Sequence, residues 1–149
     1  MATQLLEKTS TGEIKDKPEL LIFLHDHADY FLMKHRGLFK FNLEEKIYRE
    51  MSIFLENKQC SNVIKLDCNK LFREVENKFK GLFDIELFAI KVSTRYRVIV
   101  SYDFDRLFNE YHLNIYDICQ AGQYLKSARY IFNEIVNGKE KEIIWQSKD

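Results

Sequence analysis

The sequence has few residues that break or cross-link a chain, and it has no long apolar run. It contains one proline, five glycines and three cysteines in 149 residues. The most apolar stretch, Leu20–Leu24, is much shorter than the about 20 residues of a transmembrane helix. The N-terminal residues lack the apolar centre of a secretory signal peptide. We therefore expect a cytoplasmic protein with reduced cysteines and no membrane association.

An excess of charge of one sign is also missing, because 23 basic residues balance 23 acidic ones. A neutral chain lacks the positive surface that supports general nucleic-acid binding, so the composition disfavours a nucleic-acid partner. Hydrophobic residues make up 46% of the chain and aromatic residues 14%, which excludes extended disorder. The length predicts one domain with its own core.

The N-terminal part of the chain favours helices. Residues 1–15 are polar and predict a flexible segment. Apolar residues then recur at helical spacing, which predicts helices over residues 16–36, 42–57 and 67–80. Pro18 fits the first turn of the first helix, and Gly37 fits a stop after it. Asn42 and Glu45 have the spacing of a capping box at the start of the second helix. Residues 58–66 are compatible with a loop or a short strand.

Residues 84–119 form the centre of the predicted fold. Alternation of apolar and polar side chains predicts three strands that form an antiparallel meander. One face of the middle strand is wholly apolar or aromatic, namely Tyr96, Val98, Val100, Tyr102 and Phe104. The other face is mixed, as in a sheet with one partly wet side. The link 105–110 is compatible with a loop or one helical turn.

An apolar stripe after Gly122 predicts a fourth helix that ends near Asn137-Gly138. The sequence thus predicts an α+β fold, with three N-terminal helices, a three-stranded antiparallel meander and a C-terminal helix packed on the sheet. We expect a single domain over residues 16–138 and a C-terminal tail over 139–149. The tail contains Ile144 and Trp145, which fit an edge strand, a segment docked on a helix or an exposed surface patch.

Metal-binding and catalytic motifs are weakly represented. His25 and Asp29 are four residues apart, but His27 lies on another side of a regular helix, so the group HDHADYFLMKH does not predict a metal site. The three cysteines, Cys60, Cys68 and Cys119, match no ligand spacing and are interpreted as structural thiols. We therefore expect no metal and no cofactor, while a role for His25, Asp29 or His112 stays open.

Two resemblances to nuclease families concern the sheet. Arg106 and His112 have a spacing similar to that of the helical HEPN ribonucleases, but their neighbours alternate as strands do. The stretch GLFDIELFAIKVSTRYRVIVSYDFD resembles the central sheet of the RelE/ParE toxin family, in which a Tyr-Arg pair such as Tyr96-Arg97 often opens a middle strand. The resemblance covers residues 43–125. It implies that Arg97 and Arg106 hold phosphate and that Tyr124 is the C-terminal aromatic residue.

The sequence favours a protein without catalytic activity that acts through a protein partner, in the manner of immunity proteins, antitoxins and inhibitors. The aromatic content and the lack of a catalytic constellation are the reasons, and fold class alone does not decide function. The expected contact residues are Arg95, Arg97, Tyr116, Ile144 and Trp145, because tyrosine, tryptophan and arginine often dominate interfaces. The alternative is a RelE/ParE-like toxin that acts on RNA or the ribosome. A homo-oligomer is compatible with either function.

Overall fold

The computed structural model describes residues 2–7, 17–57, 59–67 and 86–147, with side chains described for residues 17–57, 59–67 and 86–135. The elements in chain order are β1 (Ala2–Glu7), β2 (Glu19–His25), α1 (Asp26–Lys34), α2 (Leu43–Asn57), β3 (Val63–Lys65), β4 (Phe88–Lys91), β5 (Tyr96–Asp105), β6 (Glu110–Gln120), the 3-10 helix η3 (Ala121–Gln123) and α4 (Tyr124–Ser147). Within these residues, six strands form one sheet in the order β1-β2-β6-β5-β4-β3. The pair β2 and β6 is parallel, and the other pairs are antiparallel.

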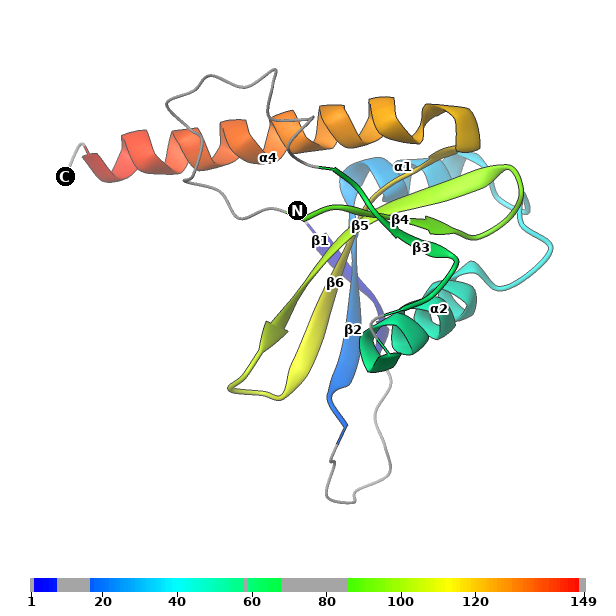
Figure 1. The fold of residues 1–149 in the computed structure, drawn as a ribbon. Helices are drawn as coiled ribbons and strands as arrows, with labels where there is room; N and C mark the ends of the chain where they lie inside the picture. Colours follow the sequence, from blue (N-terminus) through cyan, green and yellow to red (C-terminus); the bar gives the residue numbers. More distant parts are fainter. Residues whose placement is uncertain (1, 8–16, 58, 68–85, 148–149) are drawn as a thin grey trace.

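Helices cover both faces of the sheet (Figure 1). Helices α1 and α2 bury Ala28, Leu43, Ile47 and Met51 against one face of the sheet, which also contributes Ile22, Val98 and Ile115. Helix α4 buries Ala128, Ile131 and Phe132 against the other face, on Ala89 and Ile99. Val98 and Ile99 thus enter different cores because neighbouring strand residues point to opposite faces.

The predicted arrangement of the elements is wrong in two respects. Three strands do lie between Leu87 and Gln120, but β4, β5 and β6 belong to a six-stranded mixed sheet rather than to a separate antiparallel meander. Three N-terminal helices are not present as predicted, because strands β1 and β2 occupy part of that region. The third predicted helix, over residues 67–80, lies almost wholly outside the described residues.

Strand β2 occupies the position where the first half of a helix was expected. Its burial alternates along Glu19–His25, with Leu20, Ile22 and Leu24 in the core. The residues ELLIFLH satisfy a helical period and a strand period equally well, so periodicity does not decide between them. Strand β2 pairs with β1 on one side and β6 on the other, and this pairing satisfies its backbone groups. The N-terminal residues Ala2–Glu7 thus belong to the sheet, although a flexible segment was expected there.

Several local predictions agree with the structure. Helix α2 runs from Leu43 to Asn57, and the backbone N–H of Glu45 donates to Oδ1 of Asn42 at 3.1 Å. Helix α1 ends at Lys34, shortly before Gly37, whose φ of +79° suits a residue without a Cβ.

Helix α4 differs from the prediction, because it continues past Asn137-Gly138 to Ser147. No helix of the described residues is both long and apolar enough to cross a membrane.

The strand assignment of β2 can be tested by two substitutions at neighbouring positions. We expect Ile22→Ala to lower the free energy of unfolding by about 2–5 kcal/mol, since Ile22 is fully buried. Leu21→Ala should lower the free energy of unfolding by clearly less, because Leu21 is half-buried on the opposite face. A helix would reverse this order, since Leu21 belongs to its apolar stripe. Urea denaturation of both variants measures the difference, and a larger cost for Leu21→Ala would contradict the strand.

Candidate functional site

The sheet face that carries α4 is covered by that helix at one end only. Figure 1 shows α4 crossing the end where β5 begins, while the β5–β6 turn lies at the other end. On this face β5 presents in turn Ile99, which is buried, and then Ser101, Asp103 and Asp105. We call the polar side chains that continue along this face from the core under α4 toward the β5–β6 turn the polar row, which consists of His25, Ser101, Asp103, Asp105, Glu110, His112, Asn114 and Tyr116.

Hydrogen bonds link the polar row across three strands. The Ser101 hydroxyl lies 2.8 Å from the Tyr116 hydroxyl, and either group can donate. The Nε2 atom of His25 lies 3.0 Å from Oδ1 of Asn114, which joins β2 to β6. The rings of His25 and Tyr116 are also in contact, with centroids 4.6 Å apart. These contacts hold the part of the row nearer α4 in a defined geometry.

A β-bulge places Tyr116 in this row. Ile99 pairs with Asp117 and Val100 pairs with Ile115, so Tyr116 is the extra residue of β6. Burial raises the pKa of Tyr116, the negative charge of Asp103 raises it further, and the hydrogen bond with Ser101 opposes both effects. Tyr116 therefore remains a neutral phenol at pH 7 and can donate a hydrogen bond.

Two carboxylates and a histidine lie together at the far end of the polar row. One ligand atom each of Asp105, Glu110 and His112 lies within 4.8 Å of the others. Nε2 of His112 is 2.8 Å from Oε1 of Glu110, and the His112 ring meets the Phe23 ring edge to face at a centroid distance of 5.4 Å. Chemically, this group can accept a proton or hold a cation.

The β5–β6 turn, Arg106–Asn109, exposes two large apolar side chains. Leu107 is 83% exposed and Phe108 is 66% exposed. The turn is nevertheless ordered by its own residues, because Oδ1 of Asp105 accepts from the backbone N–H of Leu107 at 2.9 Å and of Phe108 at 3.3 Å. Asn109 closes the turn with φ of +51°, a conformation that asparagine tolerates better than most residues. We call Arg106–Asn109 the hairpin tip.

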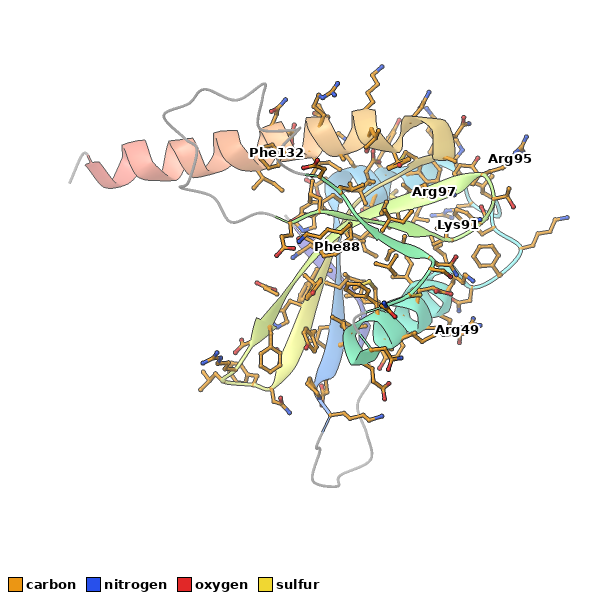
Figure 2. All side chains as sticks on the ribbon, in the orientation of Figure 1. Arg49, Phe88, Lys91, Arg95, Arg97 and Phe132 are labelled. Carbon is orange, nitrogen blue, oxygen red and sulfur yellow. The ribbon has the colours of Figure 1, made fainter. Side chains whose placement is uncertain are left out.

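The predicted contact residues whose side chains the structure describes, Arg95, Arg97 and Tyr116, have different environments. Arg95 is exposed at the β4–β5 turn (Figure 2). Arg97 is half-buried and donates from Nη1 to the carbonyl oxygens of Ser93 at 2.9 Å and Tyr96 at 3.1 Å, so its guanidinium orders that turn. Tyr116 lies in the polar row. Ile144 and Trp145 belong to α4, but their side chains are outside the described ones.

The residues of the nuclease alternative are separated by the length of β5. Arg97 is near the start of β5, and Arg106 follows its last residue. At about 3.3 Å per strand residue, their Cα atoms are roughly 30 Å apart. Tyr124, the first residue of α4, packs against the core under that helix. Arg97 and Arg106 therefore cannot hold the same phosphate group.

The cysteines and the cavity do not add a reactive site. Burial raises the pKa of Cys119 to about 11, with a further contribution from Asp117, so its thiol is protonated at pH 7. Burial and the hydrogen bond to Glu50 also raise the pKa of Cys60, and its Sγ donates to Oε2 of Glu50 at 3.0 Å. Cys68 lies outside the described residues. An apolar cavity of about 110 Å³ between Leu32, Ile47 and Ile118 is smaller than the about 300–1,000 Å³ of a typical ligand pocket.

Asp103 and Asp105 share one face of a strand, where a carboxylate pair can bind a cation, but the sequence does not predict that Glu110 and His112 join Asp105. A signal for this group was present, since Asp103 and Asp105 alternate on one strand and Glu110 and His112 alternate on the next. The missing information was the length of the turn. Only a four-residue turn places Asp105 directly opposite Glu110, and the sequence left a loop and a helical turn open.

The raised pKa of Cys119 predicts a loss of stability in alkali. Between pH 9.0 and about 11 an unfolded thiol loses its proton while the folded Cys119 keeps it, so the unfolded state is favoured as the pH rises. The effect is below about 3 kcal/mol, since one pKa unit is about 1.4 kcal/mol. Urea titrations across this range should show a smaller alkaline loss for Cys119→Ala than for the wild type. Equal losses in both proteins would contradict the burial of this thiol.

No model of a protein family, no curated protein and no solved structure matches the chain. We therefore base the functional proposal on the residues of this protein alone. These are the hairpin tip, the polar row and, where the two meet, the group Asp105, Glu110 and His112.

Proposed function

We propose that the protein acts by binding another protein and that the hairpin tip is the main contact. The observation that carries this proposal is the exposure of Leu107 and Phe108 on a turn that Asp105 holds in one conformation. A single exposed apolar residue is common on protein surfaces and needs no explanation. Two adjacent large ones at the end of an ordered hairpin are less readily explained by folding alone, because they do not contribute to the core.

The tip has the composition and the order that favour tight contacts. Arg106 precedes the two apolar residues, and Phe104 and Tyr111 form an aromatic pair just behind them, with ring centroids 5.0 Å apart. Aromatic and arginine side chains often dominate the energy of an interface. A turn that is already ordered loses little conformational entropy on binding, which leaves more of the contact energy as affinity.

The nuclease alternative has less support. Arg97 uses its guanidinium to bind backbone carbonyl oxygens, and Arg106 lies about 30 Å away along β5. The neutral charge of the chain also gives little long-range attraction for RNA. Growth arrest on expression of the wild type, relieved by Arg97→Ala, would restore this alternative.

The tip can be tested with a matched pair of variants. We expect Leu107→Asp combined with Phe108→Asp to weaken partner binding by about 2 kcal/mol or more, roughly 30-fold in Kd, because both side chains then carry charge into an apolar contact. The control is Leu125→Asp, which introduces one such negative charge at another exposed leucine, on α4. The partner is first isolated with the wild-type protein at high salt, and its Kd for each variant is then measured with purified components.

The outcomes separate the possible contact surfaces. Loss of binding in the tip variant alone supports the proposal, and equal binding by all three proteins contradicts it. Loss on truncation after Gly138 but not in the tip variant would assign the contact to the region of Ile144 and Trp145. If the partner is a second copy of this chain, light scattering should show a dimer that the tip variant cannot form.

A further inference from the structure

We propose that Asp105, Glu110 and His112 form a binding site for a divalent transition-metal ion of the zinc type. The three side chains come from the end of β5 and the start of β6 and present one ligand atom each within 4.8 Å of one another. This site goes beyond the protein-binding role of the hairpin tip, and either can hold without the other.

The separations suit a first-row metal after small side-chain movements. Zinc binds imidazole nitrogen and carboxylate oxygen at about 2.0–2.2 Å, so two ligands of a tetrahedral ion are about 3.4 Å apart. The largest separation in the group, within 4.8 Å, therefore needs to shorten by at most roughly 1.4 Å. His112 Nε2 and Glu110 Oε1, at 2.8 Å, already face each other, and they need to move apart by about 0.6 Å for an ion to replace the hydrogen-bonding proton.

The chemistry of the ligand set indicates which ion is favoured. One imidazole with two carboxylates suits zinc and its neighbours, whereas magnesium and calcium prefer oxygen ligands alone. Three protein ligands leave one position of a tetrahedral ion for water or another molecule, as in catalytic rather than structural zinc sites. The histidine is thus the residue that distinguishes this site from an ordinary group of surface acids.

The surroundings of the group hold its ligands and concentrate negative charge. Asp105 and Glu110 lie directly opposite each other in the ladder, and like charges at such a position repel. Within the described part of the chain, Glu110 is hydrogen-bonded to His112, and Asp105 has no lysine or arginine partner. The side chains of His112 and Glu110 are only 29% and 19% exposed, and Phe23 packs against the His112 ring. A cation would relieve the repulsion between two carboxylates that the backbone already holds in place.

The experiment is a titration of the full-length protein with Zn²⁺ in buffer free of chelators, followed by calorimetry and by the NMR signals of the histidine rings. The chain has four histidines, so each ring can be assigned. We expect saturable binding of one ion per chain and a change confined to the His112 ring. Loss of an outer-shell partner costs about 10–100-fold in metal affinity, so loss of a ligand in His112→Gln or Glu110→Gln should cost at least 100-fold.

The control is His27→Gln, which removes an exposed histidine on α1 and should bind Zn²⁺ as the wild type does. Mg²⁺ at the same concentrations should leave the His112 ring unchanged. Circular dichroism shows whether each variant is folded. If His112→Gln does not fold, the ring signals of the wild type still show whether His112 binds Zn²⁺. No Zn²⁺ binding, binding that moves another ring, or equal binding by wild type and Glu110→Gln would each overturn the proposal.

Discussion

The parallel pairing of β2 with β6 is the constraint on which the rest of the structure depends. It makes β6 an interior strand with β2 on one side and β5 on the other. An interior strand has no free backbone edge, and its side chains need cover on both faces. Helices α1 and α2 cover one face, and the first half of α4 covers part of the other. The same pairing ties the start of β2 to the turn region, since the N–H of Glu19 donates to the carbonyl oxygen of Asn109 at 3.3 Å.

The long β5–β6 hairpin carries both structural features and the residues of the two proposals because α4 packs on one of its ends and does not reach the other. At the covered end, Ile99 and Cys119 lie under α4, and Arg97 binds backbone carbonyl oxygens. Figure 1 shows that α4 does not reach the other end of the hairpin. The same alternation places polar side chains on that face there. Asp105 connects the two proposals, since it orders the hairpin tip through backbone N–H groups and also belongs to the group with Glu110 and His112.

The sequence was informative where one local signal dominated. Helix α2 and its Asn42 cap were predictable because a strong apolar stripe follows a capping residue. The strands β4, β5 and β6 were predictable because their apolar residues alternate and are β-branched or aromatic. The candidate site was less accessible. Leu107 and Phe108 were visible as apolar residues of a connection, but their exposure depends on how far the hairpin extends beyond the helices.

The sequence by itself determined that the chain is neutral and folded with an α+β composition of elements, because this follows from its residue types and their pattern. It also determined the two faces of β5 and the start and end of α2, because these follow from the period of side chains along a backbone. Only the tertiary structure decided that Leu20–Leu24 is strand, that β2 lies parallel to β6 and that Asp105 meets Glu110 and His112. The physical reason is the same in each case. A local period specifies which side chains share a face, whereas pairing between distant strands specifies what that face meets, and the hydrogen bonds of that pairing come from residues far away in the chain.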